Sequence, residues 1–502
     1  MPSQREVVLT AATVVSLSCG LNYLFSAYAP QIASKLDISN TQINVVGAAG
    51  NLGVYLSSPF IGRIVDRKGP RPLLAFAAVA LTAGYLIIRA FYVGGTSDDS
   101  WFSWFGVPGL VFAELLTGVG STAGLSSAGN TVAKSYKKRR AAALSIVLSG
   151  FGLSAFFYST LASLFLRSGP HDRDTTPKFL LLIAIGCCVS LLVGVVFVKP
   201  APEPEASAAS TASIDDADDH DSTVVVNERT PLVEREEQEV VVQPEPAGVN
   251  VSGWALFREV DFYLIFLYNG FCSGVGLCFI NNLGTVLRTL AYTASSFSPP
   301  PSARDLAQTQ SHLVSLLSIF NFLGRLCSGF GSDYFVHHEV ERRRISRVWW
   351  MVWTSSILTV SQVCAYRATQ VSGWHGLVVP TVLTGFAHGS LFGISGVIGL
   401  ERFGMKNFSG TNGILALAPA IFGQATNLVF GRIYDSHSRR RVSPAATQSV
   451  DTMSRPPPVP LCTAGRACYL PAFQLTIAMA SLAVVVGLVL ALGRKQMKHR
   501  AA

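Results

Sequence analysis

The stretch Gly62-Arg63-Ile64-Val65-Asp66-Arg67-Lys68-Gly69-Pro70-Arg71 decides how this chain folds. It joins two apolar runs, Ile43–Ile61 and Pro72–Ile88, each long enough to be a membrane-spanning helix. Because the connection is so short and Gly69-Pro70 favours a turn, the two helices must form a hairpin. The charged side chains then crowd one membrane face, where Asp66 can meet a basic side chain or the positive N-terminus of a neighbouring helix.

The composition places the chain in a lipid bilayer. Of its 502 residues, 49% are hydrophobic and only 14% are charged, whereas about 25% charge is usual in soluble proteins. The net charge of +9 therefore indicates positively charged loops on one side of a membrane. No nucleic-acid-binding module is present, so nucleic acid is not an expected partner.

Twelve apolar runs predict an all-α membrane protein with twelve transmembrane helices in two pseudo-symmetric six-helix halves. Spans one to six are Val7–Ala29, Ile43–Ile61, Pro72–Ile88, Val107–Val132, Ala141–Leu166 and Phe179–Val198. Spans seven to twelve are Phe262–Leu287, His312–Phe330, Val348–Ala365, Trp374–Leu400, Phe408–Ile433 and Leu475–Leu492.

Composition also sets the domain boundaries. Residues 1–198 form the first half and residues 259–502 the second. Between them, residues 199–258 are rich in Pro, Ala, Ser, Asp and Glu and cannot bury a core, so we expect an acidic disordered linker. A long polar loop, residues 436–469, separates the last two spans.

The basic clusters predict the orientation. They follow spans two, four, eight and twelve, which all end on the same side of the membrane if the count is twelve. That side, with both termini and the linker, is expected to be cytosolic. One cluster, Arg439-Arg440-Arg441, falls on the opposite side and disagrees with this assignment.

The two halves share a spacing. Gly329 and Asp333 at the end of span eight repeat the G-x-x-x-D spacing of Gly62 and Asp66, as related halves predict. The stretch Gly431–Asp435 carries the spacing again at the end of span eleven, but its position does not match.

The pattern G-x-x-x-D-R-x-G-x-R of residues 62–71 resembles the cytosolic signature of the major facilitator superfamily. The likeness implies a transporter with two rocking halves and a cytosolic gate. The gate motif then comprises Gly62, Arg63, Asp66, Arg67, Gly69, Arg71 and Asp333.

Transport through a bilayer needs polar groups that face a central cavity. The resemblance implies a cavity lined mainly by spans one, four, seven and ten, where the candidate cavity or coupling residues are Asn22, Tyr23, Glu114, Asn269, Asn281, Asn282 and His388. Asn side chains in spans often only bond a neighbouring helix, whereas ionisable groups there are costly and more often functional. Glu114 therefore either exchanges protons or pairs with Arg89 as a structural lock, and both readings remain open.

Further stretches resemble the nodulin-like and fungal monocarboxylate-transporter-homologue branch of the superfamily. They are residues 24–30, 274–284, 401–404 and 427–435. This likeness implies a vacuolar, lysosome-like membrane, with the plasma membrane as the alternative. The acidic-glycine-aromatic signature that opens true monocarboxylate transporters is missing from span one, so the substrate class does not carry over.

Two local signals lie in the loops. Glu228 with Leu232 and Val233 resembles an acidic dileucine-type sorting signal, which would bring sorting adaptors to the linker. Cys462 and Cys468 lie in the loop expected to be non-cytosolic, where both a disulfide and free thiols are open.

These features predict a secondary transporter that moves a small polar or anionic metabolite by alternating access, with proton coupling left open. The sequence contains no nucleophile–base pair, nucleotide-binding loop or metal-ligand spacing, so we expect no enzyme activity, cofactor or metal. The alternative is a transporter-like membrane sensor or scaffold that signals through the central acidic loop.

Overall fold

The computed structural model describes residues 3–38, 40–97, 99–136, 139–165, 175–200, 251–294, 303–337, 346–371, 376–439 and 465–500. Throughout these residues every regular element is a helix, and the helices belong to one compact unit. The sorting motif Glu228–Val233, most of the acidic linker and most of the loop before span twelve lie outside the described residues.

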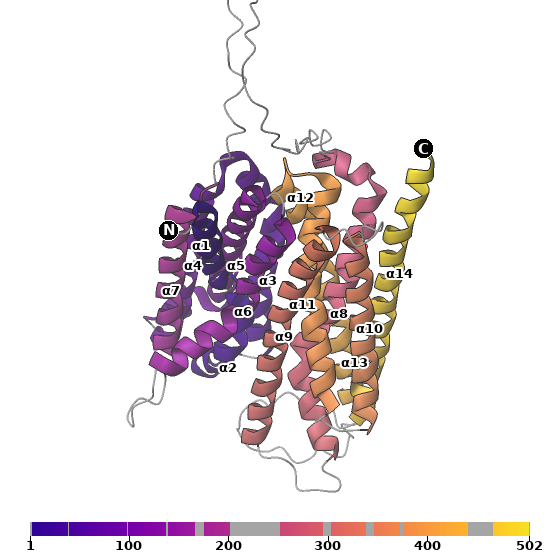
Figure 1. Ribbon diagram of the computed structural model, residues 1–502. Helices are drawn as coiled ribbons and strands as arrows, with labels where there is room; N and C mark the ends of the chain where they lie inside the picture. Colours follow the sequence, from indigo (N-terminus) through magenta and orange to yellow (C-terminus); the bar gives the residue numbers. More distant parts are fainter. Residues whose placement is uncertain are drawn as a thin grey trace, which may run out of the picture. The chain divides into compact units, whose positions relative to one another are not determined.

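Fourteen α-helices are described (Figure 1). The first half contains α1 (Gln4–Leu17), α2 (Phe25–Leu36), α3 (Asn40–Lys68), α4 (Pro70–Gly94), α5 (Trp101–Ser135), α6 (Arg140–Phe165) and α7 (Thr176–Phe197). The second contains α8 (Val260–Ala294), α9 (Ala303–His337), α10 (Val348–Val371), α11 (Val378–Phe403), α12 (Phe408–Leu415), α13 (Leu417–Arg439) and α14 (Leu470–Arg500). The short 3-10 helices are η1 (Leu21–Leu24), η2 (Gly253–Arg258) and η5 (Gly465–Cys468).

These helices correspond to the twelve expected spans because two spans are broken. Span eleven is divided into α12 and α13, and span one is divided into α1, η1 and α2. The sequence analysis treated Val7–Ala29 as one continuous helix, which differs from the structure. At the break, Gly20 packs against the backbone carbonyl of Phe151 in α6, a contact that leaves no room for a side chain.

Nine described helices are long and apolar enough to cross a membrane. Spans one, two and nine are the expected spans outside this set. Span one fails because its two helices are short, with 14 and 12 residues. The remaining two, α3 and α10, are long enough but carry many glycine, serine, asparagine or glutamine residues.

The hairpin turn between α3 and α4 has the geometry that its residues favour. Gly69 adopts a φ of +82°, in the region that glycine enters without a steric cost, and its backbone N–H donates to the carbonyl of Val65. Pro70 begins α4, where the missing N–H of proline has no helical partner to lose. The ten-residue stretch therefore folds as a tight corner.

Each half has its own hydrophobic core. One cluster of buried side chains comes entirely from α1–α7 and the residues beside them, and two others come entirely from the second half. A fourth and smaller cluster joins the halves, with Ala133, Ala141 and Leu144 on one side and Val397, Leu400 and Phe408 on the other. Most of the buried apolar surface is thus internal to a half.

Candidate functional site

Asp66 lies near the end of α3 and binds the first turn of α12 in the other half. Its carboxylate accepts hydrogen bonds from the backbone N–H groups of Ser409 (3.2 Å) and Gly410 (2.7 Å). The side-chain amide of Asn130 in α5 also donates to Asp66 and to the Ser409 hydroxyl. A carboxylate at a helix N-terminus is favoured both by these bonds and by the helix dipole.

Glycines allow α3 and α12 to meet backbone to backbone. Gly62, one turn before Asp66, lies against the carbonyl of Ser409. Gly413, one turn further along α12, lies against the carbonyl of Ser58. A methyl group at either position would overlap the facing backbone, so this close approach explains both glycines.

Asp333 makes the corresponding contact from the second half to the first. Near the end of α9, its carboxylate accepts a hydrogen bond from the backbone N–H of Ala142 (2.8 Å) in the first turn of α6. Gly329, four residues earlier, packs against Ser145 of α6 as Gly62 packs against α12. Asp333 also pairs with Arg347, which in turn pairs with Glu401 of α11.

We call the end of the bundle that carries Asp66 and Asp333 the gate end. The remaining charged members of the gate motif, Arg63, Arg67 and Arg71, are exposed there. The third copy of the spacing takes no part: Gly431 faces open space and Asp435 is exposed. Only the two copies in matching positions therefore connect the halves.

A cavity of about 170 Å³ lies between the halves. Its walls come from α3, α5 and α6 on one side and from α8, α9, α11, α12 and α13 on the other. The polar part of the lining includes Asn130 and Ser409 of the gate contact together with Ser126, Asn269, Ser395 and Asn412. Among the described residues that line it, one is charged: Arg325 of α9.

Arg325 is held in place by both halves. Its side chain is 2% exposed. Its Nε donates to the side-chain oxygen of Asn321 (2.9 Å), and its Nη1 donates to the backbone carbonyl of Leu148 in α6 (2.6 Å). The guanidinium also lies over the rings of Phe151 and Phe392, at 5.5 and 5.6 Å from their centroids. These contacts fix a cation at the cavity wall.

The sequence analysis did not select Arg325, although the signal was available. Arg325 lies within the apolar run of span eight, and an ionisable residue inside a span is costly enough to suggest a function. The same criterion selected Glu114 and His388. Restricting the search to spans one, four, seven and ten excluded this residue.

Glu114 lies inside the first half, away from the residues that line the central cavity. It is 1% exposed, and its side chain faces Gly50 of α3, where the Asn22 amide also approaches. Tyr28 and Thr117 contact its carboxyl group. In the part of the chain that the structure describes, its second carboxyl oxygen has no hydrogen-bond partner.

Arg89 does not pair with Glu114 in this structure. Its Nε donates instead to the backbone carbonyl of Pro177 in α7 (3.2 Å). Both residues are described, and no ion pair joins them. An ionised Glu114 would therefore be a buried charge without a cation beside it, which is strongly unfavourable in a bilayer.

His388 is buried in the second half and does not line the cavity. Its ring packs edge-on against Phe392, with centroids 5.0 Å apart, and against Gly276 of α8. Neither ring nitrogen has a hydrogen-bond partner among the described residues. The ring of Phe392 contacts both this histidine and the guanidinium of Arg325.

The candidate asparagines are not brought together. Asn269 lines the cavity, and Asn281 is exposed. Asn282 donates to the backbone carbonyl of Cys278 and to Asn427 of α13. Asn22 lies beside Glu114, as described above, and the side chain of Tyr23 lies outside the described part of the chain.

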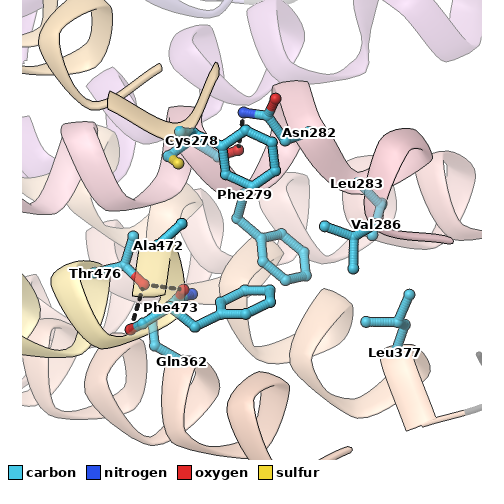
Figure 2. Close-up of a pocket in the computed structure, with 11 residues that line it drawn as sticks. Cys278, Phe279, Asn282, Leu283, Val286, Gln362, Leu377, Ala472, Phe473 and Thr476 are labelled. Atoms are coloured by element: carbon cyan, nitrogen blue, oxygen red, sulfur yellow. Dashed lines mark hydrogen bonds between the residues drawn. The ribbon is translucent and has the colours of Figure 1, made fainter. Parts of the chain in front are cut away.

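A second, much smaller pocket of about 10 Å³ lies within the second half. Figure 2 shows its polar corner, where the Thr476 hydroxyl donates to Gln362, beside the rings of Phe279 and Phe473. Asn282 lies across the pocket from them (Figure 2). This volume accommodates about one water molecule, so it is too small for a metabolite.

Cys468 is disulfide-bonded. Cys462 lies outside the described residues, so the proposed pairing of these two cysteines stays a prediction. The described part of the chain contains no cluster of side chains suited to hold a metal ion.

We predict that Asp66→Asn opens the gate end. Asparagine keeps the shape but loses the charge that favours the first turn of α12, a change of about 1–2 kcal/mol, or roughly tenfold in the population that is open there. A cysteine introduced at Ser58, which lines the cavity beside Gly413, should then react faster with a membrane-impermeant thiol reagent. Asp333→Asn should act in the same direction.

Asp435→Asn is the matched control, because it removes an aspartate from the same spacing where no helix is held. It should leave the labelling rate unchanged. Equal labelling of the Asp66 and Asp435 variants, with transport also unchanged, would rule out a gating role for Asp66.

Curated fungal proteins are similar over most of their length. "Probable transporter mch1" of Emericella nidulans is 25% identical over 508 residues, covering 86% of this chain and 80% of that protein. "Probable transporter MCH1" of Saccharomyces cerevisiae is 24% identical over 456 residues, covering 87% of this chain and 86% of that protein.

Solved transporter structures show the same fold. A bacterial homolog of the human lysosomal transporter Spinster, inward-facing and unoccupied, matches with a TM-score of 0.57 and 14% identity over 97% of each chain. The proton:xylose symporter XylE matches with a TM-score of 0.55 and 13% identity over 96% of this chain and 95% of that one. The family model of the Major Facilitator Superfamily matches residues 10–413. With its two helical halves joined at reciprocal gate contacts, the chain belongs to the Major Facilitator Superfamily of membrane transporters and is not an enzyme.

Proposed function

We propose that this transporter moves a small anionic metabolite by alternating access, with a proton carried at Glu114. The observation that carries the anion assignment is Arg325, the charged side chain of the cavity lining that the structure describes. A buried guanidinium favours a ligand that brings a negative charge, and its planar donor fork matches the oxygens of a carboxylate or phosphate.

The rest of the lining limits the size and polarity of the anion. The cavity volume is about 170 Å³. Leucine, valine and phenylalanine side chains share its wall with amide and hydroxyl groups. Such a lining suits a small anion whose charged end meets Arg325 and whose body packs against the apolar part of the wall.

Uptake of radiolabelled anions into proteoliposomes tests the proposal. A panel of acetate, lactate, succinate and inorganic phosphate should contain at least one transported anion. Arg325→Gln should raise the concentration of that anion needed for half-maximal uptake by roughly tenfold to a hundredfold, because a charge-assisted hydrogen bond to the anion is lost. Arg432→Gln, at an exposed position of α13, is the control and should be silent. Undiminished uptake by the Arg325 variant would contradict the assignment.

The support for a proton at Glu114 is its isolation. The carboxyl group is buried, Arg89 is turned toward Pro177, and the nearby side chains are the neutral Asn22, Tyr28, Tyr85 and Thr117. A neutral carboxylic acid is compatible with these surroundings, whereas a carboxylate is not. The Glu114 side chain faces Gly50 of α3, and the same helix carries Asp66. A change of charge at Glu114 therefore acts on the helix that holds the gate end closed.

Glu114→Gln should therefore remove most of the response of transport to an imposed pH gradient, while leaving folded protein abundant. Glutamine keeps the shape of the neutral acid and carries no charge. Uptake across a pH gradient, divided by uptake without one, is the measurement, with Asp435→Asn as the control. Misfolding of the variant, rescued by neutralising Arg89, would instead favour the structural lock.

We place the protein in the vacuolar or lysosome-like membrane, on the strength of the branch resemblance and the motif at Glu228, Leu232 and Val233. Replacing Leu232 and Val233 by alanine should move a tagged protein to the plasma membrane of a fungal cell, because an adaptor could no longer bind the pair. Uniform plasma-membrane fluorescence of the unaltered protein would contradict this address.

The sensor or scaffold alternative has less support. Its basis is the acidic linker, which lies almost wholly outside the described residues. The buried Arg325, Glu114 and His388 favour transport, because a scaffold has no need for ionisable groups inside a bilayer.

A further inference from the structure

The helices α6 and α9 meet across the halves in an antiparallel ladder of four contacts. From the gate end inward, Asp333 binds the Ala142 N–H, Gly329 packs on Ser145, Arg325 binds the Leu148 carbonyl, and Asn321 lies against Gly152. The four α9 residues are spaced by four, so they share one face of the helix. The ladder runs from the gate end to the central cavity.

Among the α9 residues of this ladder, Arg325 is the one that the cavity contents can reach. It lines the cavity, whereas Asp333, Gly329 and Asn321 do not. Its bond to Leu148 joins a cation to a neutral carbonyl that already lies within the turns of α6. A bound anion offers the same guanidinium an acceptor with a full negative charge that can take two parallel N–H bonds, so it attracts the guanidinium more strongly than a neutral carbonyl does.

Gly152 makes the Leu148 carbonyl accessible. It follows Leu148 by four residues, so its side chain would lie over that carbonyl on the surface of α6. A methyl group there would stand 3.0 Å from the Asn321 side-chain oxygen and 3.3 Å from Arg325 Nε. Such spacing is too tight, so the guanidinium would have to move away from α6.

We propose that Arg325 is a substrate-sensitive latch: a small anion in the cavity takes the guanidinium from the Leu148 carbonyl and thereby lets α6 and α9 separate at the gate end. The proposal rests on the proposed function for the anion alone. The latch itself involves this chain's residues alone and can be tested without any substrate.

The reporter is Ser145→Cys in the full-length protein, purified into lipid nanodiscs, with the exposed Cys327 replaced. Ser145 is fully buried against Gly329, so a cysteine there reacts with a water-soluble maleimide only when α6 and α9 part. Without anion, adding Gly152→Ala should speed labelling about fivefold, the factor expected for the loss of one net hydrogen bond.

Gly150→Ala is the matched control. It adds a methyl group to the same helix at the same distance from its nearest neighbour, here 3.0 Å from the Thr13 carbonyl oxygen. This position faces α1 within the first half and not α9. Its labelling rate should equal that of the reporter alone. If Gly152→Ala fails to fold, Asn321→Ala loosens the guanidinium from the α9 side and should also speed labelling.

Adding the anion that proteoliposomes take up best, among acetate, lactate, succinate and phosphate, should speed labelling of the reporter and not of its Arg325→Gln form. A folded Gly152→Ala protein that labels at the control rate overturns the latch. Anion uptake without any change in labelling overturns the link between binding and opening, with transport intact. If Gly152→Ala speeds labelling but the protein takes up none of the four anions, the latch is supported and the proposed anion transport is contradicted.

Discussion

A carboxylate at the first turn of a helix in the opposite half is the contact on which this structure depends. It occurs twice, with Asp66 holding α12 and Asp333 holding α6. Each bond is worth only a few kcal/mol, because a carboxylate and the N–H groups of a helix terminus exchange this bond for bonds to water when they part. Contacts of this strength join the two halves and can still be broken by thermal motion, which the gating role proposed for them requires.

The sequence predicted the fold well because the membrane leaves few alternatives. Apolar runs in a bilayer must be helices, and the Gly62–Arg71 hairpin fixed the relation of two of them. The break in span eleven had a local signal, because Pro419 lacks the N–H that a continuous helix would bond to the carbonyl of Leu415. The break in span one was not predictable, since Gly20 acts through its contact with α6, and only the folded structure brings Phe151 to it. Hydrophobic periodicity carries no information about such a partner.

The candidate site was predicted less completely. Glu114 and His388 were found as ionisable residues in spans, but they lie inside their own halves, and Arg325 of span eight is the charge in the described cavity lining. The echo of Gly62 and Asp66 in Gly329 and Asp333 was readable, because a fixed spacing survives in the sequence. Which wall a side chain faces depends on helix rotation, which a run of apolar residues does not specify.

The separation of the two cores has a thermodynamic consequence. Because most buried apolar side chains belong to clusters within one half, rocking the halves leaves those clusters intact and changes mainly the exposure of the cavity lining and of the small cluster around Leu144 and Phe408. The heat capacities of the closed and open states should then differ only by the contribution of this interface, since heat capacity follows the apolar area exposed to water. The free-energy difference between the closed and open states would then curve little with temperature. A few hydrogen bonds and charges would set its size.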